Sequence, residues 1–421
     1  MKRYRYALLA LTLVVGNASA DNWPMWRGLK NDGISQEKGL PTEWSATKNV
    51  VWSLPLPGMG NSTPCVWGDR IFLTSEDGKD LVALGVNTAG KQLWKKTLGQ
   101  TTPKARSDEG NGASASPSTD GKHVWFFVGS SELACLDFDG NEVWKFNTQE
   151  RYGEFRIMFG MHSTPVLHDG HLYLQFMHDG GQWVIALEAA TGKEIWKVNR
   201  PSDGRSECLH SYASAFMWTS GNEAYLVTHG NDYTVAHDLK DGHEIWRLGE
   251  LNGKGNNYIP SLRFVASPVC TPDLIVVPSA KGGPVVAVKP NSKGKIGAGS
   301  EHEQWRKTRD TPDVPCPLVF DGLVYLARED GFLICLDAKT GEEVYPKQRL
   351  HDQRHRASPV VADGKVYITS RDGTTSVVKA GREFELLAKN RLPESMSASP
   401  AIADGRIYIR GFKNLYAIGT K

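Results

Sequence analysis

Short apolar runs separated by polar turns recur along the chain, and most of them begin in the same way. A Ser-Pro or Ser-Thr-Pro element precedes an apolar run, then an Asp-Gly or equivalent turn, then a second run rich in aromatic and β-branched residues. Runs and turns of this kind predict β-strands joined by tight hairpins. Eight copies, about 40 to 53 residues apart, begin near residues 62, 116, 163, 214, 267, 315, 358 and 399. That spacing is typical of one four-stranded β-propeller blade per copy.

A second repeated element closes most copies. Its fullest form runs from Ala186 to Trp196 and places Trp196 four residues after Gly192. Glycine accepts the positive φ that a tight turn requires, and the aromatic ring is expected to pack on the outer strand between adjacent blades. Seven outer strands are assigned in this way, to Trp94, Trp144, Trp196, Trp246, Trp305, Tyr345 and Phe384.

The eighth copy, residues 398–418, ends before any such strand. An unassigned strand, residues 51–55 with Trp52, stands ahead of the first copy. Joining the two completes the last blade and removes exposed sheet edges. The sequence therefore predicts an all-β fold, an eight-bladed β-propeller of four-stranded blades, closed by the N-terminal strand pairing with the last blade. The propeller domain is expected over residues 50–421, with residues 21–49 as a leader that packs on it.

Composition agrees with many short strands and does not point to nucleic acid. The 421 residues include 43 Gly, 22 Pro and 13 Trp, and 40% of them are apolar. Basic and acidic residues nearly balance, at 49 and 47. A nucleic-acid-binding surface would require a basic excess, so no nucleic acid is expected as a partner.

The first twenty residues have the pattern of a signal peptide. Lys2, Arg3 and Arg5 precede a short apolar run, and cleavage is expected after Ala20. The protein is thus predicted to be periplasmic or secreted, with no membrane span and no lipid anchor, and a monomer is expected. The six cysteines could form bridges in an oxidising compartment, but their irregular spacing inside apolar runs favours buried free thiols.

The two repeated elements resemble those of the pyrroloquinoline-quinone-like (PQQ-like) β-propeller repeat family, and the glycine-aromatic element is similar to its tryptophan-docking motif. The resemblance covers about residues 44–418. It implies eight blades. It does not imply that the quinone binds, because the family contains binding scaffolds as well as quinoprotein dehydrogenases.

Three classes of function follow, and the first is the expectation: an exported, non-catalytic scaffold that binds a protein or carbohydrate ligand on one propeller face, without a cofactor. The second is a carbohydrate-active or other lyase or hydrolase acting in the central funnel. The third is a PQQ-dependent dehydrogenase with calcium. The family's quinone enzymes carry a vicinal Cys-Cys disulfide and calcium-binding carboxylates, and this sequence has no Cys-Cys pair and no C-x-x-C-H haem site.

Candidate ligand-binding residues come from the positions just before the Ser/Pro elements, because innermost strands that start on one face share one cavity. The proposed funnel cluster, with no metal site, comprises Asn61, His162, His210, Tyr212, Arg263, His355 and Arg356. Asn111 and Asp313 occupy the same kind of position. His and Arg together would favour an anionic ligand, more strongly where histidine is protonated below about pH 6.5. The alternative is a solvated channel lining. Insertions at residues 151–160 and 254–260 are expected around the cluster.

Overall fold

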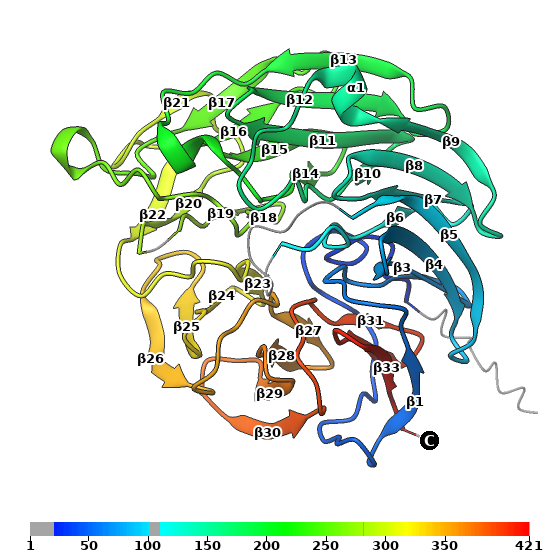
Figure 1. The fold of residues 1–421 in the computed structure, drawn as a ribbon. Coiled ribbons are helices and arrows are strands. Elements are labelled where there is room, and N and C mark those ends of the chain that lie inside the picture. Colours follow the sequence, from blue (N-terminus) through cyan, green and yellow to red (C-terminus); the bar gives the residue numbers. More distant parts are fainter. Residues whose placement is uncertain (1–20, 102–109, 281, 421) are drawn as a thin grey trace, which may run out of the picture.

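The computed structural model describes residues 21–101, 110–280 and 282–420, and its strands form eight sheets arranged in a ring, antiparallel except for one strand pair (Figure 1). The predicted eight-bladed all-β propeller is confirmed. Blades 1 to 4 comprise β2 (Cys65–Trp67), β3 (Arg70–Asp77), β4 (Asp80–Asn87), β5 (Gln92–Gln100); β6 (Ser118–Thr119), β7 (His123–Phe127), β8 (Glu132–Asp137), β9 (Glu142–Asn147); β10 (Val166–His168), β11 (His171–His178), β12 (Gly181–Glu188), β13 (Glu194–Asn199); and β14 (Phe216–Ser220), β15 (Glu223–Gly230), β16 (Tyr233–His237), β17 (Glu244–Leu248) with β21 (Gly294–Ile296).

The remaining four blades continue the ring. They comprise β18 (Val269–Cys270), β19 (Ile275–Val277), β20 (Val285–Val288), β22 (Glu303–Lys307); β23 (Leu318–Phe320), β24 (Leu323–Ala327), β25 (Phe332–Asp337), β26 (Glu343–Arg349); β27 (Val360–Ala362), β28 (Lys365–Thr369), β29 (Thr374–Lys379), β30 (Leu386–Arg391); and β31 (Ala401–Ala403), β32 (Arg406–Arg410), β33 (Asn414–Ile418) with β1 (Val50–Pro55). Short helical turns interrupt the strands at α1 (Thr148–Tyr152), η1 (Ser206–Leu209) and η2 (Gly255–Asn257).

Blade 4 departs from the four-stranded prediction. Its outer strand β17 pairs in parallel with β21, which lies within the blade 5 sequence, so this sheet has five strands. The extra strand covers the outer edge of this blade.

The ring closes as the sequence predicts. In blade 8, β1 pairs antiparallel with β33 and places Trp52 opposite Ala417; Figure 1 shows the blue strand beside the red one. A buried arginine adds a second link between the ends, because Arg410 of β32 donates to the carbonyl oxygen of Thr74 in blade 1.

The outer-strand tryptophans occupy the gaps between blades. Trp196 is 8% exposed, and its indole N–H donates to the Leu239 carbonyl of the next blade, at 2.9 Å. A Cβ on Gly242 would lie 2.7 Å from the Trp196 ring, so the turn glycine permits the close approach. The same indole bond to the next blade is made by Trp52 to Thr88, Trp94 to Phe138, Trp144 to Ala189 and Trp305 to Ala338.

Phe384 is a wrong assignment, since it precedes β30. In blade 3, Trp196 of the outer strand pairs with Ala186. The equivalent pair in blade 7 is Ala388 with Val377, so Ala388 occupies the position of the tryptophan. Trp44 of the leader lies in the space that remains: it is 3% exposed and its ring centroid lies 6.2 Å from that of Tyr367. The equivalent pair in blade 3, Trp196 with Tyr173, has 6.0 Å.

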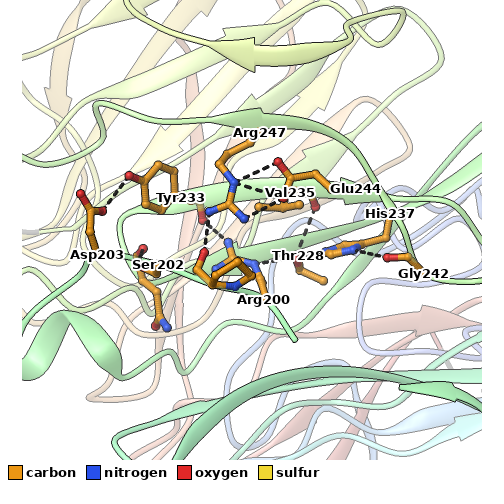
Figure 2. Close-up of polar contacts among 12 residues, drawn as sticks. Arg200, Ser202, Asp203, Thr228, Tyr233, Val235, His237, Gly242, Glu244 and Arg247 are labelled. Carbon is orange, nitrogen blue, oxygen red and sulfur yellow. Dashed lines mark hydrogen bonds and ion pairs between the residues drawn. The ribbon is translucent and has the colours of Figure 1, made fainter. Parts of the chain in front are cut away.

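An arginine also joins blades 3 and 4. The buried guanidinium of Arg200 donates to the Thr228 hydroxyl at 2.9 Å and to the carbonyls of Gly230 and Tyr233 at 3.0 and 2.5 Å (Figure 2). Burial lowers the pKa of Arg200 to about 9. Three hydrogen bonds satisfy the charge that burial disfavours.

The leader crosses one end of the propeller. Trp23 forms a β-bridge with Val66 in the innermost strand of blade 1, and the Trp26 ring lies 6.1 Å from that of Phe216 in blade 4. The fully buried Arg27 donates to the carbonyls of Pro359 and Pro317, at 2.8 and 3.1 Å. One short segment therefore contacts blades on several sides of the ring.

Two sequence predictions concern export and thiols. All six cysteines are buried and free, as predicted. Residues 1–20, the predicted signal peptide, lie outside the described residues. Among the helices that the structure describes, none has the length and apolar character needed to cross a membrane.

Candidate functional site at the channel mouth

The Ser/Pro elements build a hydrogen-bonded ring around the channel. In each of seven links, a backbone N–H of one blade donates to the hydroxyl or thiol of the repeated element of the next blade, which precedes a proline except at Ser214. Thr63 N–H donates to the Ser116 Oγ at 2.9 Å. The other links run, donor first, from Ser116 to Thr164, Thr164 to Ser214, Ser214 to Ser267, Ser267 to the Cys316 Sγ, Cys316 to Ser358 and Ser358 to Ser399.

These hydrogen bonds use one Ser/Pro element from each blade, which explains why the elements recur at blade-length intervals along the chain. The ring holds the innermost strands at a common height, so the residues just before them meet at one mouth. The mouth contains a cavity of about 240 Å³. Five residues of the predicted cluster line it, namely Asn61, His162, Tyr212, Arg263 and Arg356. Phe159, Asp313 and small residues complete the lining.

His210 and His355 do not line this cavity. The Nε2 of His210 lies 3.0 Å from Asp179 Oδ1, in the hairpin of blade 3. His355 is 1% exposed and its Nδ1 donates to the Gln353 carbonyl at 2.9 Å. Because successive residues of an extended segment point to opposite sides, Arg356 faces the mouth and His355 does not.

Phe159 is the lining residue that sequence reasoning missed. It belongs to the 151–160 insertion, and the break in the repeat was the available signal. Its ring centroid lies 5.8 Å from that of Tyr212, and its carbonyl accepts from His162 Nε2 at 2.7 Å. The 254–260 insertion lies beside Asp232, to which Tyr258 donates, and does not line the cavity.

The positive character of the mouth comes from arginine. Glu207 orients Arg263 through an ion pair of 2.5 Å, and the Arg263 guanidinium lies 5.0 Å from the centre of the Phe159 ring. Burial lowers the pKa of His162, and lowers that of His355 to about 4, so protonation of these histidines near pH 6.5 does not add the expected charge. Burial also raises the pKa of Tyr212 to about 12, which keeps its phenol a hydrogen-bond donor.

Several buried polar atoms at the mouth have no partner within the described chain: Asn61 Oδ1, His162 Nδ1 and the Tyr212 hydroxyl. Leaving such groups unpaired costs free energy, so they favour a polar ligand. Among the residues that the structure describes, one group of three side chains could hold a metal ion, Asp238, Asp241 and His243. It lies in the surface turn between β16 and β17, away from this cavity.

The architecture is that of an eight-bladed propeller whose channel mouth carries arginine, aspartate and aromatic side chains. The chain belongs to the PQQ-like repeat family: the model that matches residues 34–138, 129–297 and 293–383 is described as outer membrane protein assembly factor BamB.

A curated relative is the polyvinylalcohol dehydrogenase of Pseudomonas sp, 23% identical over 337 residues. The match covers 66% of this chain, which spans 51% of that relative. Solved structures share the fold. A quinohemoprotein alcohol dehydrogenase from Comamonas testosteroni has a TM-score of 0.71 at 15% identity, covering 95% of this chain and 81% of that one. BamB from Moraxella catarrhalis has a TM-score of 0.63 at 13% identity, covering 88% and 97%.

These findings overturn two expectations, the non-catalytic scaffold and the absence of a cofactor. The curated relative is named as a dehydrogenase, and a fold neighbour is a quinohemoprotein. The scaffold expectation rested on the lack of a compact catalytic motif, and the cofactor expectation on the lack of a Cys-Cys pair, of matching calcium ligands and of a haem motif. A channel-mouth site needs none, because its residues come from different blades and are far apart in the sequence.

Proposed function

We propose that this protein is an exported dehydrogenase that oxidises alcohol groups with a quinone cofactor bound at the channel mouth. The observation that supports the proposal best is the cavity that brings Arg263 and Arg356 together with Asp313 and two aromatic rings. The name of the curated relative supports the same class of reaction.

The lining suits pyrroloquinoline quinone, a planar tricarboxylate. Arg263 and Arg356 are suited to its carboxylates, because guanidinium groups pair with carboxylates through two parallel hydrogen bonds. Phe159 and Tyr212 offer aromatic surface. Asp313 and the unpartnered Asn61 Oδ1 are the oxygen ligands that the protein would offer to an accompanying calcium ion. The isolated cysteines provide no vicinal disulfide, so aromatic side chains alone would cover the ring.

When bound, the quinone supplies the two-electron oxidant that converts a carbinol to a carbonyl. The chain's own residues would hold the substrate and move its proton. The Asp313 carboxylate would accept the hydroxyl proton, and the Tyr212 phenol would donate a hydrogen bond to the substrate oxygen. The Glu207–Arg263 ion pair would hold the guanidinium in place over Phe159.

The substrate would enter from the face that carries the 151–160 insertion. Met158 of this insertion is 51% exposed and precedes Phe159 of the cavity wall. An exposed thioether beside the mouth favours an aliphatic chain that bears hydroxyl groups over a small polar sugar. The C-x-x-C-H haem signature is absent from the sequence, and an assay therefore needs an artificial electron acceptor.

Binding of the cofactor is the first test. The purified protein is titrated with pyrroloquinoline quinone and calcium, and the quenching of tryptophan fluorescence gives Kd. Arg356→Ala should weaken binding roughly 10- to 100-fold, since one charge-assisted hydrogen bond contributes about 1.5–3 kcal/mol. Arg382→Ala is the matched control, because Arg382 pairs with Asp337 on the exposed surface. Equal affinities in both variants, or no binding by the wild type, would refute the proposed site.

A further inference from the structure

A second, smaller chamber lies below the mouth cavity. It measures about 140 Å³ and shares Asn61, His162, Tyr212 and Arg356 with the cavity above. Trp26 of the leader forms part of its wall. The chamber's distinctive lining is a set of hydroxyls from six blades, Thr63, Ser116, Thr164, Ser214, Ser358 and Ser399.

The ring of hydrogen bonds determines what these hydroxyls can do. The oxygens of Ser116, Thr164, Ser214, Ser358 and Ser399 each accept a backbone N–H from the preceding blade. Within the described chain none of these hydroxyls donates to a protein acceptor, so their protons remain available. Thr63 differs from these residues because its hydroxyl neither donates nor accepts: the residue is 1% exposed, and its Oγ1 makes no hydrogen bond with the described residues.

Among the described residues, the chamber therefore presents hydrogen-bond donors and no carboxylate. Arg356 is its one ionised lining residue, and no Asp or Glu side chain of the described chain lines it. Its volume of about 140 Å³ exceeds several times the ~30 Å³ that one water molecule occupies in the liquid. Converging hydroxyl and guanidinium donors are the chemistry that recognises an anion.

We propose that this hydroxyl-lined chamber is a binding site for a compact oxyanion, either a free inorganic anion or a carboxylate group of a larger ligand. The anion enters through the mouth, because the chamber and the mouth cavity share lining residues. Its oxygens accept from the ring hydroxyls, and its charge interacts with Arg356. The chamber shares Arg356 with the proposed quinone site, but anion binding there requires no cofactor and no redox chemistry.

Thr63→Val tests the site with little risk to folding. Valine has nearly the shape of threonine, and the Thr63 hydroxyl makes no hydrogen bond that the substitution would remove. Ser163→Ala is the matched control: Ser163 is also 1% exposed with an unpartnered Oγ, but it lines neither cavity. The measurement is the Tm of cofactor-free protein against inorganic phosphate, with sodium chloride adjusted to keep the ionic strength constant.

Phosphate should raise the Tm of the wild type and of Ser163→Ala alike, because a ligand stabilises the state that binds it. Thr63→Val should require at least about tenfold more phosphate for the same shift. The proposal is overturned if Thr63→Val responds like the wild type, or if phosphate gives no shift up to about 100 mM. Repeating the titration with quinone-saturated protein separates the sources: a retained shift indicates a free anion, and a lost shift indicates a quinone carboxylate in the chamber.

Discussion

Two residue types recur in most blades, and each makes one kind of contact with the neighbouring blade. The hydroxyl or thiol before the inner proline accepts a backbone N–H, and the outer-strand tryptophan donates to a backbone carbonyl. Cys316 shows that the acceptor matters more than the residue type, since its Sγ accepts from Ser267 N–H at 3.1 Å in the position of serine. The blades are thus joined at both their inner and outer ends.

Trp196→Ala should lower the free energy of unfolding by about 3–5 kcal/mol, because the substitution empties a buried space and removes a hydrogen bond. Chemical denaturation measures the change. Ile195→Ala is the neighbouring control, as Ile195 is 45% exposed, and it should change stability by less than about 0.5 kcal/mol. A loss below about 1 kcal/mol for Trp196→Ala would show that the ring contributes little to blade packing.

At the scale of elements, the turn glycines and the outer-strand rings pack against each other. Gly242 and Gly364 both have positive φ, at +77° and +69°, but a Cβ would meet the Trp196 ring only at Gly242. Both changes to alanine carry the cost of a left-handed backbone, about 1–2 kcal/mol.

Gly242→Ala should be the more destabilising by a further 1–3 kcal/mol, roughly the cost of overpacking. The difference between the two midpoints of denaturation, at equal m-values, measures the ring contact alone. Equal losses in the two variants would mean that the turn glycine is needed only for its backbone conformation.

The junction of blades 3 and 4 should make stability depend on pH. His237 is buried beside Thr228 and Gly242, and Arg200 bonds to the same Thr228 hydroxyl (Figure 2). Burial, opposed by the Gly242 carbonyl and aided by Arg200, lowers the pKa of His237 to about 4. The unfolded chain binds this proton below about pH 6.5, whereas the folded chain binds it only near pH 4. The free energy of unfolding is therefore highest above about pH 6.5 and falls as the solution is acidified.

Between about pH 7 and about pH 5 one such histidine removes about 2 kcal/mol of stability. His237→Gln should therefore flatten the pH dependence of the unfolding free energy, whereas His243→Gln should not. His243 is exposed, and its hydrogen bond to Asp241 raises its pKa. An unchanged slope for His237→Gln would contradict the assignment of the buried neutral histidine.

At the scale of the whole molecule, repetition made the ring predictable. Eight phased copies and an unassigned strand with Trp52 were enough to predict the blade number and the closure through β1 and β33. The exceptions arose where the repeat is broken. The register of blade 7 places Ala388, and not Phe384, at the position of the docking tryptophan, and Trp44 fills the space from a leader that has no repeat.

The site was predictable only in part, for a physical reason. The repeat shows how far each residue lies before its innermost strand. Residues at the same distance were therefore expected at one end of the channel, and five of them share one cavity: Asn61, His162, Tyr212, Arg263 and Arg356. The direction of each side chain in an irregular segment does not follow from it. His210 accordingly pairs with Asp179, away from the mouth, and Phe159 entered from an insertion.

The central claim, that the channel mouth oxidises alcohols with a bound quinone, is tested most directly by alcohol-dependent reduction of an artificial electron-accepting dye. Protein loaded with pyrroloquinoline quinone and calcium should reduce the dye with a secondary alcohol as substrate. Asp313→Asn should lower kcat roughly 10²-fold or more, the usual contribution of a proton acceptor, while Arg382→Ala should match the wild type. A protein that binds the quinone yet reduces no dye with primary, secondary or polymeric alcohols would contradict the account.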